Sequence, residues 1–184
     1  MSTENPTITP AHLLPFGCVV HVFAKIEFIM QAMIGAMAGT NLSSVLFMTG
    51  GLGFRARRDC LLNIAKLKRP DIVPELEKIL ERIQTANTLR NNVAHSIWKP
   101  GRRPGSIKPI GAITQGGKAR VVGVSDNERE WTPEELWNDA HQIELLHTEL
   151  DEFSERSGLA AIIDRMTDET NAPTSPENGT PPSK

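Results

Sequence analysis

The sequence predicts an all-α protein, an antiparallel four-helix bundle with a β-hairpin inserted between its third and fourth helices. Three observations lead to this fold class. Apolar residues recur at three- and four-residue steps in four long segments. Aromatic residues make up 5% of the chain and tyrosine is absent, which argues against an all-β sandwich. A Gly/Pro-rich break and two short β-type runs separate the third helical segment from the fourth.

One domain with two tails accounts for the length of 184 residues. Residues 1–10 are polar and contain two prolines, so we expect a flexible N-terminus. Residues 11–166 carry the helical periodicity and form the predicted domain. Residues 167–184 are rich in proline, serine and threonine and are expected to form a disordered tail.

The first predicted helix covers residues 16–38 and is expected to lie in the core. Methionine is common on its apolar stripe, and we favour core packing over an adaptable binding surface. The stripe comprises Val19, Phe23, Ile26, Met30, Met33 and Met37. His21, Lys25 and Glu27 interrupt the apolar run, which favours a buried helix over a membrane span. No signal peptide is visible at the N-terminus, so we expect a cytoplasmic protein.

The second predicted helix covers residues 53–68, and the third runs from about residue 71 to about residue 98. The expected polar face of the second helix holds five cations: Arg55, Arg57, Arg58, Lys66 and Lys68. The three arginines open the helix, where positive charge opposes the helix dipole, so an anionic partner is attractive. Glu27 and the acidic fourth helix are equal candidates for that partner.

A β-hairpin is expected at residues 106–124, because "KPGRRPG" ends the third helix and Gly116-Gly117 forms a two-residue turn. The fourth helix, residues 133–156, begins with a full capping signature. Its N-cap, first residue and capping-box partner are expected to be Thr132, Pro133 and Glu135. The apolar piece "GLAAIIDRM" then extends this helix or packs against it.

The net charge of −2 hides a strong asymmetry. Residues 52–120 carry fifteen basic and five acidic groups, a net charge of +10, whereas residues 121–184 carry four basic and fifteen acidic groups, a net charge of −11. The basic middle segment therefore faces phosphates or the acidic C-terminal third. The two cysteines form no CxxC or Cys/His cluster, and no metal or cofactor site is predicted.

The segment "TLRNNVAHSIW" holds the strongest candidate for chemistry. At 100° per residue, Arg90 points into the apolar stripe of the third helix, so its guanidinium must find a carboxylate, reach water or line a polar cleft. We expect Glu27 to be its nearest carboxylate. Arg90, Asn91 and His95 form one polar arc, with Arg90 and His95 about 7–8 Å apart along the helix axis. They can flank a phosphodiester or meet copies from a partner across a two-fold axis.

The residues "RNNVAH" resemble the signature of the HEPN domain superfamily, an Arg followed by a polar residue, with a His five to seven positions after the Arg, late in a bundle helix. Ala94 before the His and Trp98 after it fit a common bacterial version of the signature. The resemblance covers residues 15–157, although about ten residues are motif-like. It implies a homodimer that brings two motifs together in one cleft.

Many HEPN proteins are metal-independent endoribonucleases of toxin–antitoxin or phage-defence systems, and the resemblance implies this activity and RNA as the partner. In that scheme His95 is the general base or the general acid, and Arg90 stabilises charge on the phosphate oxygens. Asn91 orients the His or the phosphate. A cognate antitoxin or a defence-system partner is an implied protein partner, and membrane association is not expected.

Four basic residues follow the motif and are expected to bind RNA phosphates: Lys99, Arg102, Arg103 and Lys108. The alternative for them is an ordinary solvated loop. For the whole protein, the main alternative to a nuclease is a non-catalytic dimeric interaction module of the same fold, in which Arg90 and His95 are structural. A small-molecule sensor that uses the Met-rich core is a third class.

Overall fold

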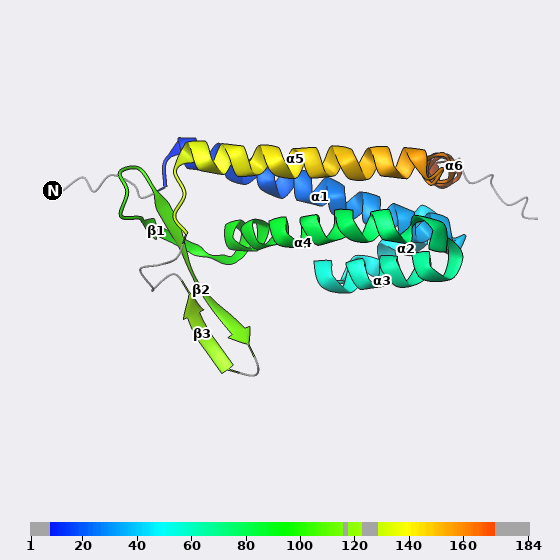
Figure 1. The fold of residues 1–184 in the computed structure, drawn as a ribbon, viewed down its shortest axis with the longest axis horizontal. Coiled ribbons are helices and arrows are strands. Elements are labelled where there is room, and N and C mark those ends of the chain that lie inside the picture. The colour runs from blue at the N-terminus through cyan, green and yellow to red at the C-terminus, as the bar shows by residue number, and fades with distance from the viewer. Residues whose placement is uncertain (1–7, 116–117, 123–128, 172–184) are drawn as a thin grey trace, which may run out of the picture.

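The computed structural model describes residues 8–115, 118–122 and 129–171. The helices are α1 Pro10–Ala38, α2 Leu42–Thr49, α3 Phe54–Lys68, the 3-10 helix η1 Pro70–Ile72, α4 Val73–His95, α5 Pro133–Arg156 and α6 Ala160–Asn171. The strands are β1 Ile97–Pro100, β2 Ile107–Gln115 and β3 Lys118–Val122. The long helices lie side by side, and the strands project from one end of the bundle (Figure 1). The predicted class, mostly helical with an antiparallel hairpin between the last two long helices, is confirmed.

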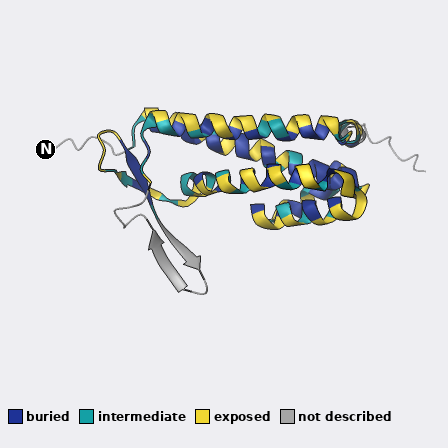
Figure 2. Cartoon of the chain, viewed as in Figure 1, coloured by how far each residue is buried: buried dark blue, intermediate teal, exposed yellow. Residues whose placement is uncertain are grey.

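Helix α1 lies in the core and contacts every other α-helix. Its methionines confirm the core-packing prediction, because Met30 and Met33 are fully buried. Buried residues gather where the helices face one another (Figure 2). Helix α1 begins at Pro10 rather than near residue 16, because Thr9 caps it and Pro10 takes a position where proline is favoured. By length and composition α1 is also apolar enough to cross a membrane, and in this structure it packs against all the other α-helices.

The directions of the helices differ from the predicted antiparallel arrangement. Phe23 of α1 stacks edge-on against Phe54 of α3, and one turn later in both helices Glu27 pairs with Arg57. Helices α1 and α3 are therefore parallel, and Figure 1 shows α5 running the same way. Arg82 of α4 pairs with Glu149 of α5, and the earlier α4 residue Glu75 pairs with the later α5 residue Arg156, so α4 runs opposite to α5.

Helix α2 explains the parallel pair, and the sequence pattern did not predict it as a helix. Its N-cap Asn41 accepts a hydrogen bond from the Ser44 N–H at 2.8 Å. The chain between α1 and α3 must return along α1 before α3 begins, and α2 forms most of this return. A long helix followed by a short return helix gives parallel neighbours, whereas a tight turn would have given the predicted antiparallel pair.

The sheet has three strands in the order β1-β2-β3, all antiparallel. The hairpin of β2 and β3 agrees with the prediction, and its turn at Gly116-Gly117 lies outside the described residues. Strand β1 was not predicted, because α4 was expected to continue to residue 98. The helix ends at His95 instead, since Ser96 is extended and Trp98 packs between Phe16 and Trp131.

Helix α5 begins as predicted. Thr132 accepts a hydrogen bond from the Glu135 N–H, and the Glu135 carboxylate accepts one from the Thr132 N–H at 2.8 Å. The following helix, α6, continues to Asn171, past the predicted start of the tail at residue 167. The apolar piece before residue 167 thus forms a separate helix that packs against α1, α2 and α5.

Candidate functional site

The three predicted catalytic residues line one cavity of about 810 Å³. Arg90, Asn91 and His95 lie in the last two turns of α4 and form one wall. The opposite wall is the turn from Gly50 to Gly53 with the first turns of α3, and Glu27 of α1 completes the cavity. The polar arc inferred from helix geometry therefore faces a hollow lined largely by charged and amide side chains.

Arg90 satisfies two of the predicted alternatives, since it lies near a carboxylate and also lines a polar cleft. Its Nη2 is 4.0 Å from Glu27 Oε1, which confirms Glu27 as the expected nearby carboxylate. Its Nη1 donates a hydrogen bond to Asn91 Oδ1 at 3.3 Å. The side chain of Arg90 is 29% exposed, and Asn91 and His95 are exposed. The guanidinium is thus oriented by Glu27 and Asn91 while it stays accessible to a ligand.

Glu27 is shared with a second arginine, Arg57 of α3. Arg57 was predicted on a polar surface, which is wrong, because its side chain is 5% exposed. Its Nη1 is 3.1 Å from Glu27 Oε1, and its Nη2 donates to the Leu52 carbonyl at 2.8 Å. A buried cation needs such partners, and the return segment after α2 supplies them. Of the two anionic partners proposed for the α3 arginines, Glu27 is the one that Arg57 contacts.

Two amide side chains in the cavity are incompletely satisfied. Asn87 is 7% exposed and its Oδ1 has no hydrogen-bond donor in the described structure. The Gln84 Oε1 is also buried without a partner. A buried acceptor without a donor costs about 1–3 kcal/mol, which favours a bound water or ligand at this wall. Asn87 lies three residues before Arg90, on the same side of α4.

The four basic residues after the motif lie apart from this cavity, and none of them is among its lining residues. Lys99 on β1 is paired in register with Lys108 on β2, and Lys108 is buried. Arg103 makes two hydrogen bonds of 2.7 Å to the Glu135 carboxylate. The Arg102 N–H donates to the Glu130 carboxylate at 2.9 Å. Here the basic middle segment faces the acidic C-terminal third, and the role of these residues in RNA binding stays a prediction.

This ion pair gives a testable pH dependence. The Arg103 guanidinium, with the Thr132 N–H, lowers the pKa of Glu135 from 4.5 to about 2. Because the pKa of Glu135 is lower in the folded state than in the unfolded state, its ionised carboxylate stabilises the fold above pH 4.5. This stabilisation is lost as the pH falls toward 2. We expect Glu135→Gln to lower the free energy of unfolding by about 0.5–1 kcal/mol at pH 7, because the ion pair is partly exposed and screened by solvent. In urea unfolding series, this difference should shrink between pH 4.5 and pH 2, and a constant difference would contradict the assignment.

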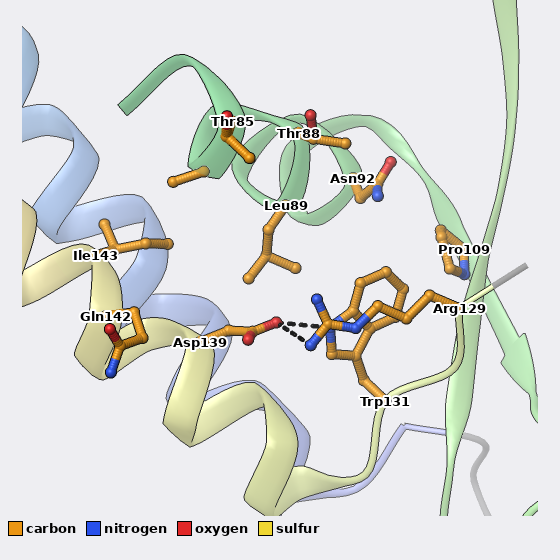
Figure 3. Close-up of a pocket in the computed structure, with 11 residues that line it drawn as sticks. Thr85, Thr88, Leu89, Asn92, Pro109, Arg129, Trp131, Asp139, Gln142 and Ile143 are labelled. Carbon is orange, nitrogen blue, oxygen red and sulfur yellow. Dashed lines mark hydrogen bonds and ion pairs between the residues drawn. The ribbon is translucent and has the colours of Figure 1, made fainter. Parts of the chain in front are cut away.

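A second cavity of about 630 Å³ lies on another face of α4, toward α5 (Figure 3). Leu89 and Ile143 form its apolar walls. Arg129 lies 4.9 Å from the Trp131 ring centre and pairs with Asp139 at 2.8 Å, and the Trp131 indole N–H donates to the same carboxylate. Its charged groups are therefore paired with one another, and it contains no predicted site residue.

The remaining titratable groups do not form another centre in the part of the chain described. No group of three or more His, Cys, Asp or Glu side chains gathers among residues 8–115, 118–122 and 129–171. Cys18 and Cys60 are half-buried free thiols. His147 is half-buried on α5, and burial together with the charge of Lys25 lowers its pKa. A protonated His147 is thus disfavoured, which fits a packing role.

No protein-family model, curated protein or solved structure matches this chain. The family resemblance of the motif that begins at Arg90 therefore stays a prediction.

Proposed function

We propose that the protein is a metal-independent endoribonuclease of HEPN type that acts as a cytoplasmic homodimer. One observation carries the proposal: Arg90, Asn91 and His95 line the same cavity, with Glu27 beside the arginine. A guanidinium, an amide and an imidazole are together the groups that phosphodiester cleavage needs for charge stabilisation, orientation and proton transfer.

The proposed reaction is an attack of the RNA 2′-hydroxyl on its own phosphodiester. His95 accepts the proton of the 2′-hydroxyl as general base, or donates a proton to the leaving 5′-oxygen as general acid. Arg90 stabilises the negative charge that builds up on the phosphate oxygens, and Asn91 holds Arg90 or the phosphate in place. The bond from phosphorus to the 5′-oxygen breaks, which leaves a 2′,3′-cyclic phosphate and a 5′-hydroxyl.

Two features support a dimer. Arg90 and His95 are separated by about 7–8 Å along α4, so one copy does not place both groups on the same atom. An exposed apolar face of α1 lies on the flank of Glu27, with Leu13, Val20 and Phe28 between 44% and 55% exposed. A second copy that covers this face would bury these apolar side chains, and in the proposed dimer the two motifs share one cleft. A toxin or phage-defence role, with a matching antitoxin or defence partner, belongs to the same proposal.

The direct test is cleavage of a mixed RNA pool in EDTA by the purified protein, with the oligomeric state measured by size-exclusion chromatography. We expect fragments that end in 2′,3′-cyclic phosphate, which end-specific labelling detects. DNA and 2′-O-methyl RNA of the same sequence should remain intact, because both lack the nucleophile. Absence of cleavage by a folded dimer would favour the non-catalytic interaction module.

A further inference from the structure

The N-terminus of α3 forms the wall of the cavity opposite Arg90, and it lacks a cap. Its N-cap residue is Gly53, which has no side chain to accept a hydrogen bond, and its first turn contains no acidic residue. The N–H groups of Phe54, Arg55 and Ala56 precede the first intrahelical bond, which the Arg57 N–H donates to Gly53. Most helices place an oxygen at this position, because the uncapped N–H groups and the dipole attract negative charge.

The first turns of α3 also carry three arginines where cations are unfavourable. Arg57 is neutralised by Glu27, and Arg58 lies 4.0 Å from Asp59. Arg55 is exposed, lines the cavity and makes no ion pair among the described residues. The charged side chains that line the cavity are three arginines and two carboxylates: Arg55, Arg57, Arg90, Glu27 and Asp59. The cavity is therefore positively charged even with His95 neutral.

A second and independent observation points to a ligand at this wall. Arg57 of α3 lines the cavity and is 4% exposed, and its Nε–H has no hydrogen-bond acceptor in the described structure, which leaves a buried donor for an anion. There is also room beside the helix end, because a Cβ atom built on Gly53 would meet no atom within 4 Å. The backbone there is open to close approach by a ligand.

We propose that the N-terminus of α3, with Arg55, is a second phosphate-binding site that holds a non-scissile phosphodiester of the RNA whose cleaved bond lies at Arg90 and His95. The inference rests on the proposed function, which identifies the bound nucleic acid as RNA. The chemistry of the α3 wall by itself selects a phosphate. Three free N–H groups at a helix N-terminus and one free guanidinium match the oxygens of a phosphodiester. The two walls then grip neighbouring phosphates of one strand, which fixes the register of cleavage.

The test replaces Gly53 by aspartate, with Gly53→Ala as its matched control. An aspartate at the N-cap bonds the free N–H groups and repels phosphate, so the variant should melt about 1 °C higher than the wild type while it loses RNA affinity. Binding is measured by fluorescence anisotropy with a labelled 2′-O-methyl RNA, which is not cleaved. We expect affinity about tenfold weaker for Gly53→Asp and nearly unchanged for Gly53→Ala. Inorganic phosphate should compete with the RNA for the wild type.

A second pair of variants keeps the test decisive if Gly53→Asp does not fold. Arg55→Ala removes the free guanidinium and should weaken RNA binding, whereas Lys66→Ala removes one exposed cation from the far end of the same helix. If Gly53→Asp folds and binds as tightly as the wild type, or if both alanine variants weaken binding equally, the second site is overturned.

Failure of this inference is distinguishable from failure of the nuclease proposal. If the wild type cleaves RNA and Gly53→Asp binds RNA normally, only the second site is wrong. If the wild type binds 2′-O-methyl RNA through Gly53 and Arg55 but cleaves nothing, the site stands and the nuclease is wrong. If the wild type binds neither RNA nor phosphate, both are wrong.

Discussion

Replacement of His95 by alanine is expected to lower the rate of RNA cleavage about 1,000-fold and to leave the fold unchanged, because a positioned acid or base contributes about 10²- to 10⁴-fold. The side chain of His95 is exposed at the last residue of α4, so its removal leaves no cavity in the core. The measurement is single-turnover cleavage of a labelled RNA, together with the melting temperature and the elution volume. His141→Ala is a matched control, since the His141 side chain is 62% exposed on α5, outside the cavity.

The interaction-module alternative predicts the opposite pattern. If His95 serves the dimer interface, His95→Ala should lower the melting temperature or shift the protein toward the monomer. Cleavage per remaining dimer would then be unchanged, or absent in the wild type as well. Arg90→Ala distinguishes the nuclease from the interaction module in the same way, because the nuclease loses the group that stabilises the transition-state charge.

The largest effect on stability is expected at Glu27. Glu27→Gln should lower the free energy of unfolding by about 3 kcal/mol, because it leaves the buried guanidinium of Arg57 without a countercharge. The Leu52 carbonyl continues to accept one of its hydrogen bonds, so the loss is short of complete unfolding. Equilibrium unfolding in urea measures the change. Glu81→Gln removes an exposed carboxylate from α4 and should have an effect within about 0.5 kcal/mol.

A double variant checks the cause of that loss. In Glu27→Leu/Arg57→Met the charge pair is replaced by apolar side chains, and we expect stability to return to within about 1 kcal/mol of the wild type. If the double variant is as unstable as Glu27→Gln, packing of the methylene groups rather than charge compensation explains the defect. Activity is measured in parallel, because Glu27 also lies 4.0 Å from Arg90.

Local signals in the sequence predicted the parts of the fold that local chemistry determines. The capping box at Thr132 and Glu135, the methionine core of α1 and the β2–β3 hairpin all depend on neighbouring residues, and each agrees with the structure. At the site, helix geometry alone placed Arg90, Asn91 and His95 on one arc, and the structure brings them to one cavity.

Tertiary contacts determine what the pattern missed. The polar residues of α3 predict a surface position for Arg57. Its burial depends instead on the carboxylate of Glu27, thirty positions earlier in the chain. The sequence predicts Lys108 as a basic residue that binds phosphate or lies in a solvated loop. In the structure it is buried, because β1 pairs with β2. Strand β1 itself forms where Trp98 meets Phe16 and Trp131, two residues far away in the sequence. The parallel direction of α1 and α3 follows from the length of the return segment, which periodicity does not encode.

The position of α1 in the bundle has a consequence for how the chain is made. Helix α1 is synthesised before its most extensive packing partner, α5, which ends at Arg156. Until that helix is synthesised, the side of α1 that packs against α5 is uncovered. Contacts between such distant segments slow folding and leave nascent chains prone to aggregation. We therefore expect α1 to reach its native packing only after α5 has been synthesised.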